Sequence, residues 1–318
     1  MDNDRIKFFP ISAFSVILGL AGVTIAFEKA VEIFDFPIDL SKYFLSITTI
    51  TFILISFMYI LKMVKYFDEV KKDFKNPVKL NFFPTISVAL LLLSISFLST
   101  NVFLSKYLWV IGTIIHTIFT YKIISIWVFH PKFDIKYFNP AWFIPVVGNM
   151  LIPVAGIAHI NQEILWFFYS VGLLFWVILF SIFIYRIIFH HPLPEKLIPT
   201  LAILIAPPAI GFTAYVKLTH NIDGFAKILY YFALFLTTFL LSEYKMFSKI
   251  KFYLSWWAYS FPLASMSISS ALMYHMTDVY IFKIISIALI TIVSLIILIL
   301  IPKTIIAIKR HEICIEEE

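Results

Sequence analysis

Apolar segments with and without proline alternate along the whole chain, and this alternation constrains the fold more than any other feature. Each segment is close to the ~20 residues that a helix needs to cross a bilayer. Proline bends or locally unwinds a helix, so one member of each consecutive pair is bent and its partner is straight. We therefore predict five helical hairpins, with ten spans at residues 9–28, 43–61, 82–104, 107–129, 139–160, 165–188, 197–216, 225–242, 253–274 and 280–301.

The composition places the chain in a membrane. Hydrophobic residues make up 61% and charged residues 14% of its 318 residues, and the mean hydropathy is +0.94. A soluble domain of this length could not bury so much apolar surface. We expect a single all-α transmembrane domain over residues 1–318, whose first apolar run is a retained helix rather than a signal peptide. The single cysteine, Cys314, excludes a disulfide within one chain, and we expect no metal and no cofactor.

The basic residues predict the orientation. If the N-terminus is cytoplasmic and the segments alternate, 19 of the 25 lysines and arginines lie at cytoplasmic ends; the other six are Lys29, Lys42, Lys106, Lys217, Lys227 and Lys283. The positive-inside rule then places both termini in the cytoplasm, and we expect a multi-pass protein of the cell membrane. The net charge of +6 follows from this asymmetry and does not indicate a nucleic-acid partner. Lys122 and Arg186 lie where long side chains can reach the cytoplasmic interface.

The prolines mark five equivalent, parallel spans. Such helices suit a pore lining with quasi-fivefold symmetry, with the five straight helices outside it. Pro10 and Pro84 lie in a first turn, where proline costs little. Pro145, Pro208 and Pro262 lie deeper, and each deletes an interior hydrogen bond. The candidate lining residues are these five prolines and Ser12, Ser15, Gly19, Ser87, Gly148, Pro153, Gly211 and Ser265. Small residues also let helices pack closely with no pore between them, and this alternative stays open.

Three blocks of the sequence resemble the tellurite-resistance/dicarboxylate transporter family, which includes TehA-type channels and the plant slow anion channels. They are NPAWFIPVVG at 139–148 followed by PVAG at 153–156, SWWAYSFP at 255–262, and FPIS at 9–12 through GLAG at 19–22. The resemblance implies five hairpins around a central pore, a homotrimer with one pore per subunit, and conduction of anions. It also implies that the phenylalanine of the ninth span, here Phe261, closes the pore.

The predicted pore is neutral, because the proline-bearing spans carry no lysine or arginine in their middles. A neutral lumen discriminates by the cost of removing water, so weakly hydrated anions such as nitrate or iodide should pass more easily than chloride. The alternative is a proton-coupled carrier for dicarboxylates or for oxyanions such as sulfite or tellurite. It needs a titratable group, for which His116 is the central candidate. We do not expect an enzyme, because no acid cluster, nucleophile elbow or phosphate-binding glycine loop occurs.

Overall fold

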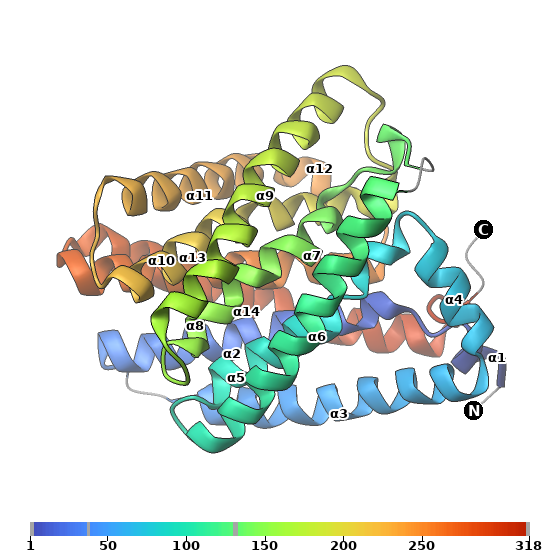
Figure 1. Cartoon of the computed structure of the whole chain (residues 1–318), viewed down its shortest axis with the longest axis horizontal. Coiled ribbons are helices and arrows are strands. Elements are labelled where there is room, and N and C mark those ends of the chain that lie inside the picture. Colours follow the sequence, from blue (N-terminus) through green and yellow to red (C-terminus); the bar gives the residue numbers. More distant parts are fainter. Residues whose placement is uncertain (1–2, 37–38, 130–132, 316–318) are drawn as a thin grey trace.

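The computed structural model describes residues 3–36, 39–129 and 133–315, and within these ranges it contains helices and no strand (Figure 1). The α-helices are α1 (Asn3–Lys7), α2 (Ser15–Phe34), α3 (Ser41–Lys65), α4 (Phe67–Lys75), α5 (Thr85–Phe97), α6 (Val102–Phe129), α7 (Ile144–Val147), α8 (Ile152–Gly156), α9 (Gln162–Phe189), α10 (Ala206–Thr219), α11 (Gly224–Ser242), α12 (Tyr244–Ser248), α13 (Ser260–Thr277) and α14 (Tyr280–Lys309). The all-helical fold class is as the sequence predicts.

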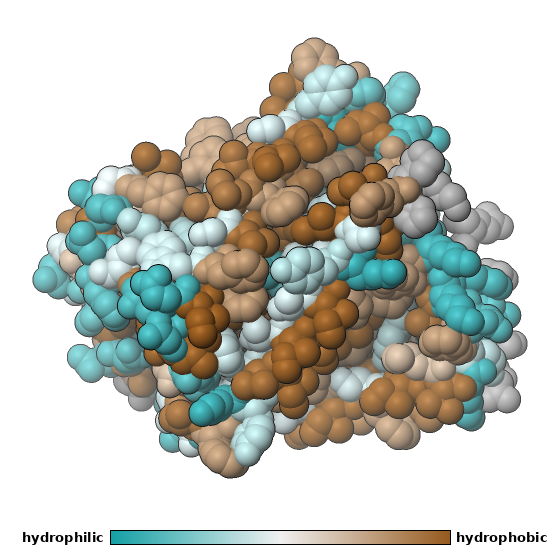
Figure 2. Space-filling view, viewed as in Figure 1, coloured by the Kyte–Doolittle hydropathy of each residue, from teal (hydrophilic) through white to brown (hydrophobic). Residues whose placement is uncertain are grey.

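Eight helical stretches of the described residues are long and apolar enough to cross a membrane. They are Ile11–Phe34, Ser41–Lys65, Lys79–Phe97, Val102–Phe129, Gln162–Phe189, Glu195–Thr219, Gly224–Ser242 and Tyr280–Lys309. The stretch Pro140–Gly156 is apolar but shorter, and α13 is not among the eight. Figure 2 shows apolar side chains over much of the middle of the visible face, with hydrophilic ones gathered toward its two ends. Eight membrane helices are therefore supported, and ten spans remain a prediction.

Every proline-bearing stretch begins as a 3-10 helix and continues as an α-helix. The 3-10 segments are Ile11–Phe14, Lys79–Phe82, Pro140–Phe143, Glu195–Ile205 and Leu254–Tyr259, and the fifth stretch returns to 3-10 geometry at Gly148–Leu151. We expected Pro145, Pro208 and Pro262 to interrupt continuous helices; instead each lies in the first turn of an α-helix. The reason is that N–H groups in the first turn have no i−4 acceptor within the α-helix, so proline interrupts no α-helical hydrogen bond there.

The proline-bearing helices lie inside the molecule, and the continuous helices cover them. In the most apolar part of Lys79–Phe97, 83% of the residues are buried, whereas in that of Ser41–Lys65 only 17% are buried. Among the inner helices, α2 packs against α5, α5 against α8, α8 against α10, α10 against α13, and α13 against α2. Each inner helix also packs against the outer helix that follows it, namely α3, α6, α9, α11 or α14. Helix α14 extends beyond the predicted 280–301 and contains Pro302, so proline is not confined to the inner helices.

The two ends of the described chain lie at the same end of the molecule, together with α4 (Figure 1). The Arg5 guanidinium Nη2 donates to the Ile308 carbonyl at 2.6 Å, which ties the first residues to the last turn of α14. Helix α4 is amphipathic: Val70 is buried, whereas Asp68 and Lys71 are exposed. We call this end of the molecule the α4 end.

Candidate functional site

A cavity of about 1030 Å³ opens at the α4 end and extends inward between the inner helices. All five proline-bearing stretches contribute to its wall. On α2, α5, α10 and α13 the wall consists of residues in the first turns, and it goes no deeper than Leu18, Val88, Ile210 and Pro262. We call this cavity the vestibule. It occupies the entrance of the inner helices and ends where their tightly packed part begins.

The structure brings together some of the residues that the sequence singled out and not others. Those in the vestibule wall are Pro10, Ser12, Ser15, Gly148, Phe261 and Pro262. Those outside the wall are Gly19, Pro84, Ser87, His116, Pro145, Pro153, Pro208, Gly211 and Ser265. Neighbours of the absent residues take their places, since Pro207 and Ile210 line the vestibule where Pro208 and Gly211 do not.

Phe261 lies at the inner end of the vestibule, in the first turn of α13. Its half-buried ring lies against α2: a Cβ atom added to Gly22 would be 3.1 Å from Phe261 Cδ2 and 3.0 Å from Ala264 Cβ. Ser265 Oγ donates to the Phe261 carbonyl at 2.8 Å, so that hydroxyl is used within the first turn of α13. The aromatic ring is therefore supported by one helix and packed closely against a second.

Most of the other small and hydroxylated residues mediate helix packing. A Cβ on Gly19 would collide with Ser260, so α2 and α13 approach closely there. Ser267 exchanges hydrogen bonds with Ser286 of α14, and Ser269 Oγ donates to the Ala209 carbonyl of α10 at 2.9 Å. The packing role, which the sequence left open, accounts for these residues.

His116 is completely buried on α6, directly behind the vestibule wall. Its Nδ1 lies 2.9 Å from Ser87 Oγ of α5, and Thr120 Oγ1 donates to both the His116 and Pro145 carbonyls. A Cβ added to Gly148 would collide with the His116 ring, so the histidine lies directly against this residue of the vestibule wall. The Nε2 atom has no hydrogen-bond partner among the described residues.

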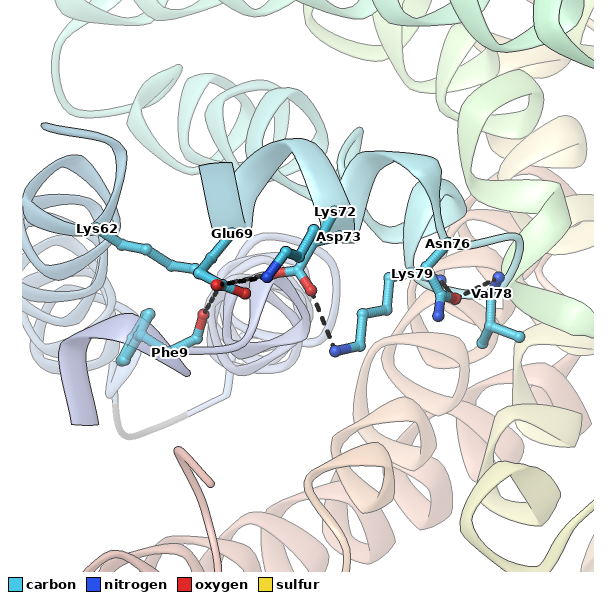
Figure 3. Close-up of polar contacts among 8 residues, drawn as sticks. All are labelled: Phe9, Lys62, Glu69, Lys72, Asp73, Asn76, Val78 and Lys79. Carbon is cyan, nitrogen blue, oxygen red and sulfur yellow. Dashed lines mark hydrogen bonds and ion pairs between the residues drawn. The ribbon is translucent and has the colours of Figure 1, made fainter. Parts of the chain in front are cut away.

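The mouth of the vestibule is rich in charge (Figure 3). The Lys62 ammonium donates to Asp73 Oδ2 at 2.6 Å and to the Phe9 carbonyl at 2.9 Å, and the Lys79 ammonium contacts Asp73 Oδ1 at 3.1 Å. These contacts fix α4 against the first residues of the chain. The charged residues in the described wall are seven basic ones and four acidic ones: Lys7, Lys62, Lys72, Lys79, Lys136, Arg186 and Lys196, against Glu69, Asp73, Asp134 and Glu312.

Sequence reasoning missed how deeply two of these cations are buried. Lys62 and Arg186 are each 2% exposed, although both lie in the last turns of apolar helices. We expected Arg186 to reach the membrane interface; instead it faces inward on α9, because its part of that helix packs against the segment around Lys136. A carboxylate eleven residues after Lys62 was the only signal of its ion pair, and α4 must fold back to bring the two together.

The described part of the chain gives no support for a metal site. No group of three or more histidine, cysteine or carboxylate side chains is placed there to hold a metal ion. The one cysteine, Cys314, lies in the vestibule wall, where burial raises the pKa of its thiol.

Eight apolar helical stretches that could cross a membrane, together with a cavity whose described wall holds more basic than acidic residues, fit a multi-pass membrane protein. The family model described as SLAC1, voltage-dependent anion channel, matches residues 8–305. The chain belongs to this family, which comprises anion channels and transporters and not enzymes. The resemblance seen in the sequence is thereby confirmed, and an anion-transport role is supported.

Individual relatives come from distant organisms. An uncharacterized transporter of Methanocaldococcus jannaschii is 30% identical over 85% of this chain and 86% of its own length. The S-type anion channel SLAH3 of Arabidopsis thaliana is 28% identical over 82% of this chain but only 42% of its own length. The tellurite resistance protein TehA homolog of Haemophilus influenzae is 26% identical over 84% of this chain and 81% of its own length.

Proposed function

We propose that this protein is a passive channel for small monovalent anions, with Phe261 as its gate. The observation that carries the proposal is the vestibule: all five proline-bearing stretches line it, its mouth has an excess of basic residues, and it ends at an aromatic ring. An apolar ring across a narrow passage excludes water, so an ion must lose its hydration shell to pass. The relatives named as S-type anion channels support the same activity.

The architecture that we propose is a single domain of ten spans in five hairpins with quasi-fivefold symmetry. The contacts of α2, α5, α8, α10 and α13, each with the next and α13 with α2, support a pore enclosed by inner helices. Each subunit of a homotrimer would hold one pore, in the cell membrane and surrounded by lipid. The α4 end, with both ends of the described chain and the basic vestibule, would face the cytoplasm.

Selectivity divides between the two parts of the path. The basic mouth attracts anions and repels cations. This effect reaches about one Debye length, which is roughly 10 Å at 0.1 M salt. The residues that end the vestibule, including Leu18, Val88 and Phe261, carry no charge. They favour anions that lose water easily. We therefore expect nitrate and iodide to be more permeant than chloride; a reversal-potential series in which chloride or sodium exceeds nitrate would contradict this.

The test is anion flux into proteoliposomes at fixed pH with no proton gradient. We expect low flux in the wild type and a sharp increase in Phe261→Ala, because the substitution opens the passage to water. Phe252→Ala is the matched control: Phe252 also lines the vestibule but lies outside the inner helices, so its removal should leave the flux low. Equal flux in wild type and Phe261→Ala would exclude Phe261 as the gate.

A proton-coupled carrier for dicarboxylates or oxyanions is the second candidate, and the position of His116 favours it. This histidine is buried, has an unpartnered Nε2 among the described residues, and lies behind Gly148 at the vestibule wall. A carrier would move sulfite or a dicarboxylate only under a pH gradient, and His116→Ala would abolish that movement. In a channel, His116→Ala would leave the anion flux unchanged. This variant therefore distinguishes the two functions.

A further inference from the structure

Arg186 is a buried cation with unused hydrogen-bond donors at the vestibule. Its side chain is 2% exposed, and the residue belongs to the vestibule wall. Nη2 donates to the Lys136 carbonyl at 3.3 Å, whereas Nε and Nη1 have no partner among the described residues. No carboxylate of the described chain lies within ion-pair distance of the guanidinium, in contrast to Lys62, the other buried basic residue at this end.

Lys62 is the appropriate comparison. It is buried to the same extent at the same end, but Asp73 neutralises its charge and the Phe9 carbonyl accepts a further hydrogen bond. A guanidinium cannot lose its proton in a protein, so burial leaves Arg186 charged. A buried charge is tolerated when it is paired and hydrogen-bonded. Arg186 has no such anionic partner among the described residues. An anion that enters the vestibule could become that partner.

We propose that Arg186 is a binding station for a small planar oxyanion, of which nitrate is the simplest example. This inference rests on the proposed anion conduction and adds to it a site at which the anion pauses before Phe261. Arg186 forms part of the vestibule wall, so an anion in the vestibule lies beside this residue. Because Nε and Nη1 are buried, the guanidinium turns toward the cavity to contact the anion. The bound anion supplies the charge that no described carboxylate supplies.

The guanidinium favours oxyanions over halides. Its N–H groups lie in one plane with fixed spacing and match two oxygens of a flat anion, whereas a spherical halide uses such a set of donors less fully. A lysine at the same place would act as a point charge with little preference between the two. The station therefore distinguishes anions by shape, independently of the hydration cost at Phe261.

The experiment measures thermal unfolding of the purified full chain in detergent, with nitrate replacing chloride at constant ionic strength. We expect a saturable rise of the midpoint with nitrate in the wild type. Arg186→Gln should weaken nitrate binding about tenfold or more, as loss of a charge-assisted hydrogen bond implies. Without nitrate, Arg186→Gln should unfold at or above the wild-type midpoint, because it removes an unpaired buried charge. A purely structural arginine would lower the midpoint.

Two further variants keep the test decisive. Arg186→Lys retains the charge and should lose most of the preference for nitrate over chloride. Lys122→Gln removes an exposed positive charge that lies outside this wall and should leave the nitrate shift unchanged. An equal nitrate shift in wild type and Arg186→Gln overturns the station. So does a wild type that ignores nitrate but gains stability from acidic phospholipid only when Arg186 is present.

The station and the channel can fail separately. If Phe261→Ala conducts nothing but the nitrate shift depends on Arg186, the conduction proposal fails and the binding site stands. If Phe261→Ala conducts nitrate and no midpoint shift depends on Arg186, the channel stands and the station is wrong.

Discussion

The mouth of the vestibule and its inner end differ in chemistry although they share one cavity. At the mouth, Lys62, Asp73 and Lys79 form a cluster around a shared carboxylate, and further basic residues line the wall. At the inner end, Leu18, Val88, Ile210 and Phe261 present only apolar groups, and glycines bring helices into contact. Charge is thus separated from the inner end of the vestibule, where we place the gate of the proposed channel.

In the proposed channel, this separation lets the pore select anions without a charge at its gate. A fixed cation at the constriction would hold an anion too tightly for rapid passage, and its burial would be costly. At the mouth, water and paired carboxylates lower that cost, while the excess positive charge still raises the local anion concentration. The following predictions test the two regions separately, from the largest expected effect to the smallest.

The largest effect is expected at the mouth, from Lys62→Met. The substitution leaves the Phe9 carbonyl without its partner and removes one of the two lysines at Asp73. Breaking a buried ion pair from one side costs about 3–5 kcal/mol, measurable as a large loss in thermal midpoint. Lys71→Met is the control, because the Lys71–Asp68 pair is exposed and such pairs contribute about 1 kcal/mol or less. Equal losses would mean that the mouth does not depend on its buried pair.

The next effect is expected behind the constriction, from Gly148→Ala. The new Cβ would collide with the fully buried His116 ring and approach Val88 Cγ2 at 3.0 Å. Overpacking of this kind costs about 1–3 kcal/mol. In a double-mutant cycle, His116→Ala should offset much of that cost, because it removes the ring that collides. Additive losses would show that His116 and Gly148 are not coupled.

The sequence predicts the inner helices better than it predicts the charges. Proline can be read directly as a first-turn or helix-breaking residue, and Pro10, Gly148 and Phe261 do meet in one cavity. The 3-10 entry of each stretch escaped prediction, because hydropathy and proline spacing do not distinguish a bent helix from one that begins late. That difference moved the prolines from helix interiors to first turns.

Arg186 and Lys62 escaped prediction for a different reason. A basic residue at the end of an apolar helix looks the same in sequence whether it faces lipid headgroups or the protein. The direction of the side chain depends on what packs beside it. Lys62 turns toward Asp73 of α4, and Arg186 turns toward the Lys136 carbonyl in the segment before α7. These are tertiary contacts, and no local pattern specifies them. Ser87 was ambiguous in the same way, since a hydroxyl suits both a pore and a helix contact.

A smaller effect is expected at the constriction from Gly22→Ala. Its Cβ would be 3.0 Å from Ala264 Cβ and 3.1 Å from Phe261 Cδ2, so the aromatic ring must move by a few tenths of an ångström. A perturbation of about 1 kcal/mol in the closed state changes its population about fivefold, and the basal flux should change accordingly. Gly211→Ala is the control, because its nearest neighbour would be 3.5 Å away in ordinary contact. A flux change of equal size in both variants would show that the contact between Gly22 and Phe261 does not control the flux.

The smallest effect is expected from the charge at the mouth acting on Cys314. Burial raises the pKa of its thiol above the usual value, and Arg5 and Lys62 offset part of the rise. Only the thiolate reacts, so alkylation should be slow at pH 7 and accelerate about tenfold per pH unit below the pKa. At low ionic strength a sulfonate-bearing thiol reagent should react severalfold faster than a trimethylammonium one, and salt should reduce the difference.

Unfolded protein provides the control for this last comparison, because the two reagents should differ much less there than in the folded protein. If the anionic and cationic reagents modify Cys314 in folded protein at equal rates at low salt, the excess positive charge of the wall does not act on this thiol. The mouth would then lack the field that the separation of charge from constriction requires. If the anionic reagent is faster and Lys62→Met reduces its advantage, the cluster around Asp73 contributes directly to attracting anions into the vestibule.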